Sequence, residues 1–128
     1  MFLSFKTDDD RRKYGGSAFI ELQYCNLPAD SDINQLVSVD NIINWKADSL
    51  YIYIDDDNSF VEEYGHIFTG GTYNNLKTGP VDICGINYYS PQQVTEIVRI
   101  IKADKPLDYS TILPWLQKSE QNNGIYIL

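Results

Sequence analysis

The pattern of hydrophobic and polar positions along the chain predicts a strand over residues 18–24 and another over residues 50–54. Residues 18–24 alternate, with Ile20, Leu22 and Tyr24 on one face and polar side chains on the other, as in a half-buried strand. Residues 50–54 run Leu-Tyr-Ile-Tyr-Ile, and β-branched and aromatic residues of this kind favour strands. We therefore expect a strand over each segment.

The clearest helix is expected from residue 90 until just before Pro106. Ser90 stands in the N-cap position, Pro91 in the first helical position, and Gln93 completes a capping box. An apolar stripe follows at spacings of three and four residues, formed by Val94, Ile97, Val98 and Ile101.

Weaker signals outline the rest of the chain. Ser31 or Asp32 can cap a short helix that ends near Asp40. A second C-terminal helix is expected over residues 110–122, with Pro114 tolerated only in its first turn. Short strands are expected at residues 1–5, 67–69, 81–86 and 125–128, and loops at residues 8–16, 55–59 and 70–75.

This order of elements lacks the regular alternation of strand and helix that a parallel α/β fold shows. We expect an α+β fold, with a mostly antiparallel sheet and two to three helices packed against it. The chain has 128 residues, of which 43% are hydrophobic and 22% charged, and this is the size and composition of one globular domain. We therefore expect residues 1–128 to form a single domain.

The charge balance narrows the range of partners. Lys and Arg number 10 against 18 Asp and Glu, so the formal net charge is −8. A negative field repels phosphate backbones and anionic membrane surfaces, which argues against direct nucleic-acid or membrane binding. The same field attracts a basic protein and speeds the encounter with it. Acidity that only keeps the protein soluble is the simpler alternative.

Cysteine usage and the first residues of the chain favour a cytoplasmic protein. Cys25 and Cys84 are too few for a disulfide framework, and we expect both to be reduced and buried. The opening residues lack the basic and apolar regions of a signal peptide, and no apolar run is long enough to span a membrane.

The sequence offers no pattern that predicts catalysis, a metal site or a cofactor. A calcium-binding EF-hand loop starting at Asp55 would need Gly at its sixth position and Glu at its twelfth, where Phe60 and His66 stand. His66 is the only histidine, which rules out a multi-histidine metal site. The glycines match neither the P-loop nor the dinucleotide-binding pattern. We therefore expect the protein not to be an enzyme.

A protein-binding surface is the function class that the residues favour. Carboxylates gather after the predicted strand at residues 50–54 and could attract a basic partner, while tyrosines supply rigid, amphipathic contact area. We expect the partner-binding residues to be Asp55, Asp56, Asp57, Glu62, Glu63, Tyr64, Tyr73 and Asn74.

Residues 64–101 contain Tyr-Gly-His-Ile-Phe-Thr-Gly-Gly, then Thr-Gly-Pro, then Tyr-Tyr-Ser-Pro-Gln-Gln-Val. This pattern resembles that of the YfbM-like family of small bacterial proteins. In that family a glycine-rich segment and a turn precede a similar helix start. The resemblance implies, as one alternative, a small ligand-binding domain or enzyme that uses residues 65–80, with His66 and Asp82 as polar groups.

The size, the acidity and the lack of catalytic residues are also similar to the immunity proteins of bacterial contact-dependent growth inhibition systems. Such proteins neutralise a cognate toxin domain, often a nuclease. This second resemblance is one of type, and it implies a basic toxin domain as the protein partner, whose active or substrate-binding face would be occluded. Our leading hypothesis is therefore that the protein is an immunity or inhibitor protein.

Overall fold

The computed structural model describes residues 1–16, 18–42 and 45–128 and contains one antiparallel sheet. Within these residues the sheet has seven strands in the spatial order β1-β3-β2-β7-β6-β4-β5. The strands are β1 (Phe2–Leu3), β2 (Phe19–Tyr24), β3 (Leu50–Tyr53), β4 (Thr69–Tyr73), β5 (Thr78–Pro80), β6 (Asn87–Tyr89) and β7 (Ile125–Ile127).

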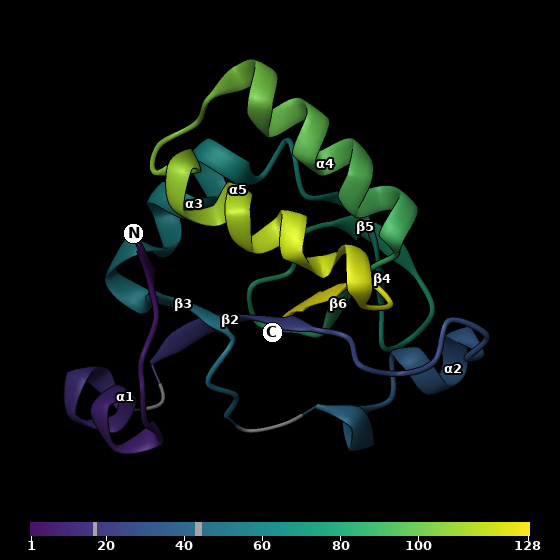
Figure 1. Ribbon diagram of the computed structural model, residues 1–128, viewed down its shortest axis with the longest axis horizontal. Coiled ribbons are helices and arrows are strands. Elements are labelled where there is room, and N and C mark those ends of the chain that lie inside the picture. Colours follow the sequence, from purple (N-terminus) through teal and green to yellow (C-terminus); the bar gives the residue numbers. More distant parts are fainter. Residues whose placement is uncertain (17, 43–44) are drawn as a thin grey trace.

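Helices cover both faces of the sheet (Figure 1). They are α1 (Asp8–Gly15), α2 (Ile33–Leu36), α3 (Asp57–Tyr64), α4 (Pro91–Asp104) and α5 (Tyr109–Lys118), with 3₁₀ turns η1 (Val39–Asn41), η2 (Ile54–Asp56) and η3 (Ser119–Gln121). Figure 1 shows α3, α4 and α5 on one side of the sheet and α1 and α2 on the other. The predicted α+β class is confirmed, although the described residues hold more helices than the two or three expected.

The main hydrophobic core lies between the sheet and the three helices α3, α4 and α5. Alternation along β2 sends Ile20 and Leu22 into this core, where they meet Phe60 of α3, Ile101 of α4 and Leu116 of α5. A smaller cluster forms on the opposite face, where α2 packs over the centre of the sheet, and it contains Cys25, Leu36, Val37, Tyr88 and Tyr126.

Strand β7 occupies the centre of the sheet and joins its two halves. It pairs with β2 on one side, where Leu22 faces Ile127, and with β6 on the other, where Tyr88 faces Tyr126. All three β7 residues are buried, so the ladder hydrogen bonds on both sides are shielded from water.

Helix α4 matches the sequence prediction closely. The Ser90 hydroxyl accepts a hydrogen bond from the Gln93 amide at 3.2 Å, and the Gln93 side chain accepts one from the Ser90 amide at 2.8 Å. The Gln93 side chain also donates to the carbonyl oxygen of Gly70 at 2.8 Å. The capping box therefore satisfies two helix-end amides and also ties α4 to β4.

A loop was expected over residues 8–16, but Asp8–Gly15 form the helix α1, so that prediction is wrong. The Thr7 hydroxyl caps the helix by accepting from the Asp10 amide at 3.1 Å. Asp8 pairs with Arg11 at 2.6 Å and with Arg12 at 3.0 Å, one turn further along. The helix buries no side chain, so it lacks the apolar stripe on which the prediction relied.

The prediction also fails between residues 54 and 59, where η2 and the start of α3 replace a strand end and a loop. Ile54 leaves the strand and is 42% exposed. Asp57 lies in the first turn of α3, where a carboxylate interacts favourably with the helix dipole. The cluster of carboxylates therefore lies on η2 and α3 and not on a loop.

The strand predicted at residues 67–69 is displaced to β4, and the one at 81–86 is replaced by β5 and a turn. Gly71 allows β4 to pass the ring of Tyr89, because a Cβ atom there would lie 2.8 Å from the ring carbon Cζ. The buried side chain of Asn87 holds the turn by accepting from the Asp82 amide at 2.8 Å and donating to the Asp82 carbonyl at 2.7 Å.

Helix α5 begins one residue before the predicted start, and Pro114 lies in its interior. The expectation that Pro114 falls in the first turn is wrong. Proline has no amide hydrogen to donate to the carbonyl four residues earlier, at Ser110. Both residues are exposed, so water can satisfy that carbonyl.

Ser90→Ala should lower the free energy of unfolding by about 1 kcal/mol, because it removes the hydroxyl that caps α4. Urea unfolding followed by circular dichroism measures the change. Ser110→Ala, at an exposed position in the first turn of α5, is the matched control and should change stability by less than about 0.5 kcal/mol. Equal effects of the two substitutions would show that the capping box does not hold α4.

Candidate functional site

Five of the predicted partner-binding residues form what we call the acidic surface: Asp55, Asp56, Asp57, Glu62 and Glu63. All five lie on η2 and α3, and Asp55 and Glu62 are exposed. None of the five carboxylates forms an ion pair with a described residue. Residues 47–76 hold six carboxylates and no Lys or Arg, so no cation from the same segment offsets this charge.

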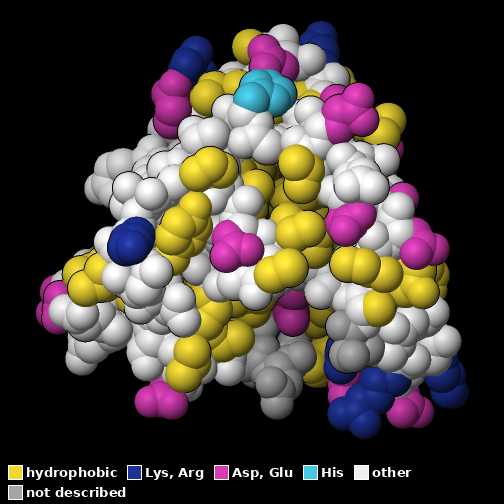
Figure 2. Space-filling view, turned by 180° about the vertical axis from the view of Figure 1, so that it is seen from behind, with side chains coloured by type: hydrophobic (Ala, Val, Ile, Leu, Met, Phe, Trp, Pro, Cys, Tyr) yellow, Lys and Arg dark blue, Asp and Glu magenta, His cyan; other side chains and the backbone are white. Residues whose placement is uncertain are grey.

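Exposed hydrophobic side chains lie beside these carboxylates. Ile54 is 42% exposed, Val61 44% and Leu107 52%. Val61 follows Asp57 by four residues, so the two side chains share one side of α3. In Figure 2, which views the molecule from behind, acidic and hydrophobic side chains lie interspersed on the side where α3 runs, with the histidine near the upper edge. The surface therefore offers both charge and apolar area.

Tyr64 is fully buried, and the expectation that it is an exposed anchor is wrong. Phe60 and Tyr64 lie four residues apart on the side of α3 that faces the core, and their rings stack at a centroid distance of 5.6 Å. The Tyr64 hydroxyl donates to the carbonyl oxygen of Leu107 at 2.5 Å. Tyr64 therefore cannot contact a partner directly, but its hydrogen bond holds Leu107 beside α3.

Burial raises the pKa of Tyr64, and the negative charges of Asp108 and Glu63 raise it further. Both carboxylates therefore lie close enough to the same hydroxyl to act on it. Asp108 also accepts a hydrogen bond from the N-terminal ammonium of Met1 at 2.8 Å. The Met1 ammonium therefore offsets the negative charge of Asp108 in the loop that precedes α5.

Tyr73 and Asn74 lie apart from the acidic surface. They stand at the end of β4, and the strand order places β2, β7 and β6 between β3, which leads to η2, and β4. The half-buried Tyr73 donates its hydroxyl hydrogen bond to the carbonyl oxygen of Pro80 and so closes the β4–β5 hairpin. The eight predicted residues therefore do not form one surface.

The alternative site at residues 65–80 is not assembled around His66 and Asp82. The His66 Nε2 atom lies 3.2 Å from the Asp104 carboxylate at the end of α4. The Asp82 carboxylate accepts from the Cys84 amide at 3.0 Å within its own turn. Among the described residues no hydrogen bond or ion pair joins His66 to Asp82.

The two cysteines are free and differ in their surroundings. Cys25 is buried, and its thiol donates to the Tyr126 hydroxyl at 3.4 Å, which in turn donates to the carbonyl oxygen of Leu36. Burial, with a smaller contribution from Cys25, raises the pKa of Tyr88 to about 12. Cys84 is exposed, so the expectation that both thiols are buried is wrong for Cys84.

A polar cluster that was not predicted from the sequence lies on the face of the sheet opposite α4 and consists of Glu21, Gln23, Ser49 and Tyr51. Burial raises the pKa of Glu21, and the Gln23 amide donates to its carboxylate at 2.9 Å. The buried hydroxyls of Ser49 and Tyr51 lie near enough to favour the charged carboxylate, although neither forms a direct hydrogen bond. The alternation of β2 indicated polar residues on this face, but no local sequence signal indicated that Gln23, Ser49 and Tyr51 would be buried there.

The described residues contain no group of three or more His, Cys, Asp or Glu side chains placed to hold a metal ion. No helix in the described ranges is both long enough and apolar enough to cross a membrane. Comparisons with protein-family models, curated proteins and solved structures found no match to this chain. The resemblance of residues 64–101 to the YfbM-like family therefore stays a prediction.

Glu21→Gln should stabilise the protein more at pH 7 than at pH 4. The pKa of Glu21 is raised in the folded state, so folded Glu21 holds its proton more tightly than unfolded Glu21. Stability is therefore lost as the pH rises from the unfolded pKa through the folded pKa, and glutamine, which does not ionise, removes that loss.

Urea unfolding of both proteins at the two pH values provides the measurement. Glu62→Gln, at an exposed position, removes the same charge and serves as the control. A stabilisation by Glu21→Gln that is equal at pH 4 and pH 7, or larger at pH 4, would contradict the expected burial cost.

Proposed function

We propose that this protein is a cytoplasmic immunity or inhibitor protein that binds a basic bacterial toxin domain through the acidic surface. The observation that supports the proposal is the set of unpaired carboxylates on η2 and α3, next to the exposed side chains of Ile54, Val61 and Leu107. No catalytic step and no cofactor enters this function.

The composition of the surface supports a protein partner. Carboxylates without cations of their own can pair with Lys or Arg of another protein, and this long-range attraction raises the association rate. Apolar side chains add affinity when they leave water, at roughly 25 cal/mol per Å² of buried apolar area. A surface that only kept the protein soluble would need no apolar residues among its charges.

Occlusion is the proposed mechanism of inhibition. A nuclease active face carries cations that bind phosphates, and the carboxylates of the acidic surface would take the place of those phosphates. Helix α3 presents Asp57, Glu62 and Glu63 on a rigid element because Phe60 and Tyr64 anchor it in the core. A rigid surface loses little conformational entropy on binding, which favours high affinity.

The proposed interface differs from the one expected from the sequence. It keeps the five carboxylates of the acidic surface and gains Ile54, Val61 and Leu107. It excludes Tyr64, which is buried, and also Tyr73 and Asn74, which lie on β4 and its turn near the opposite edge of the sheet.

The first experiment is a pull-down with this protein as bait and the product of the adjacent upstream gene as the candidate toxin. A stoichiometric complex that weakens as salt is added would support the proposal. The absence of a complex at micromolar protein concentrations would overturn the proposal for that candidate.

Charge reversal locates the interface. The double variant Asp55→Lys with Glu62→Lys should lower the association rate constant about tenfold at low salt. The loss should be smaller at high salt, because salt screens the electrostatic attraction that speeds association. The matched control reverses two exposed carboxylates near α2, Asp30 and Asp40, and so changes the net charge equally. Surface plasmon resonance at two salt concentrations measures both. Equal losses for both variants would show that only net charge acts.

Truncation of Leu107 tests the apolar part of the interface. Leu107→Ala should raise the dissociation rate constant about fivefold to tenfold, because a largely exposed leucine would lose its buried contact in the complex, worth about 1 kcal/mol or more. Stability should change little, since the hydrogen bond from Tyr64 goes to the backbone of Leu107. An unchanged dissociation rate would exclude Leu107 from the interface.

A further inference from the structure

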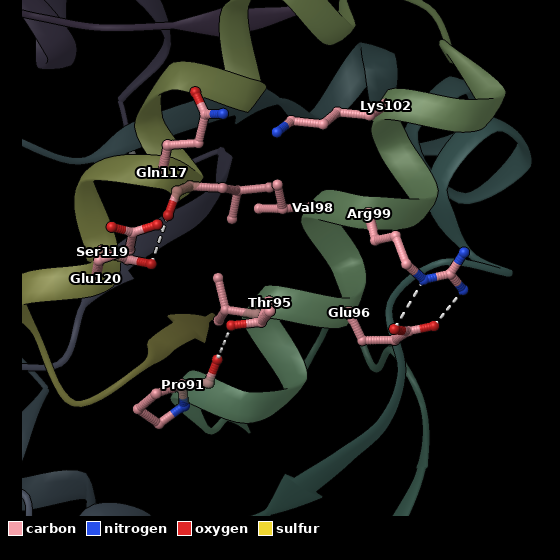
Figure 3. A pocket seen from close by; sticks show the side chains of 11 residues that line it. Pro91, Thr95, Glu96, Val98, Arg99, Lys102, Gln117, Ser119 and Glu120 are labelled. Carbon is pink, nitrogen blue, oxygen red and sulfur yellow. Dashed lines mark hydrogen bonds and ion pairs between the residues drawn. The ribbon is translucent and has the colours of Figure 1, made fainter.

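A groove with a volume of about 540 Å³ runs between α4 and α5 (Figure 3). Its floor is apolar and consists of Val94, Val98 and Leu116. Pro91 and Thr95 border the groove near the start of α4. The volume falls in the range of small-molecule sites in proteins, roughly 300–1,000 Å³.

One residue of the apolar stripe of α4 is only partly buried, because it borders the groove. Val94, Ile97 and Ile101 are buried, but Val98 is only partly buried and points into the space between the helices. Leu116 of α5 is fully buried beneath it. A ligand with an apolar body would complete the burial of Val98, which contributes favourable free energy.

The charged groups around the groove are arranged asymmetrically. The Lys102 side chain reaches across the groove toward the Gln117 amide (Figure 3), and Lys102 forms no ion pair with any described residue. Arg99 and Glu96 also border the groove, but they form an ion pair with each other, so the positive charge of Arg99 is neutralised. Glu120 borders the side of the groove formed by α5 and η3.

We propose that this groove binds a small organic acid with an apolar body. The acid group lies between the Lys102 ammonium and the Gln117 amide, which both donate hydrogen bonds to it. The apolar body lies over Val98 and Leu116. Glu120 repels an anion from its own side of the groove, so the charge arrangement sets the orientation of the ligand.

This site is separate from the acidic surface, which lies on η2 and α3. Ligand binding in the groove can therefore be tested without the toxin. Failure of the immunity proposal would leave the groove proposal unaffected, and failure of the groove proposal would leave the immunity proposal unaffected.

The test uses 1-anilinonaphthalene-8-sulfonate, a fluorescent probe with an aromatic body and one sulfonate. Its fluorescence should rise and saturate at one probe per protein. Lys102→Gln should weaken binding about tenfold, because it removes a hydrogen bond from a charged donor. Thr95→Trp, at an exposed position on the α4 wall, should abolish binding by filling the groove.

Lys118→Gln is the matched control, because Lys118 is an exposed lysine of α5 that does not line the groove. It should change probe affinity by less than about twofold. Circular dichroism and urea unfolding of each variant establish that the fold is kept. Equal probe binding by the wild type, Lys102→Gln and Thr95→Trp would overturn the site.

Competition with three straight-chain compounds tests the charge preference. Decanoate should displace the probe, while decylamine and decan-1-ol, which match its apolar chain but lack the acid group, should need at least about tenfold higher concentrations. Displacement by all three at similar concentrations would overturn the assignment of Lys102 and Gln117 as the acid-binding pair.

Discussion

The pairing of β7 with β2 and β6 holds the rest of the structure in place. Without this central strand the sheet would consist of two separate three-stranded parts, β1-β3-β2 and β6-β4-β5. The joined sheet supplies the continuous apolar face on which α3, α4 and α5 pack. Both candidate sites depend on that face, because the acidic surface lies on α3 and the adjoining η2, and the groove lies between α4 and α5.

At both sites, contacts in the buried core determine where the exposed functional side chains lie. On α3, the stacked rings of Phe60 and Tyr64 fix the inner side of the helix, so the carboxylates are presented on its outer side. The hydrogen bond from Tyr64 to Leu107 brings a separate loop to the same surface. Between α4 and α5, Val98 is only partly buried, so part of its apolar surface stays accessible to a ligand.

The sequence predicts those parts of the structure whose signals are local. The caps of α4 and the alternation of β2 are contained in a few neighbouring residues, and both elements form as expected. Helix α1 was missed because ion pairs and a Thr7 cap stabilise it without a buried face. The burial of Tyr64 and the separation of Tyr73 from the carboxylates depend on the strand order, which no local pattern encodes.

The position of β7 also has a consequence for the way in which this chain folds. Leu22 pairs with Ile127, so the centre of the sheet brings together residues from nearly opposite ends of the chain. Closing so large a loop costs the chain conformational entropy. That cost comes before the β2–β7 ladder forms, so the burial of the ladder offsets it only afterwards. Domains dominated by such non-local pairings fold in milliseconds to seconds rather than microseconds. Until β7 docks, the inner edges of β2 and β6 expose unpaired backbone groups, and that interval is when a growing aggregate could capture the chain.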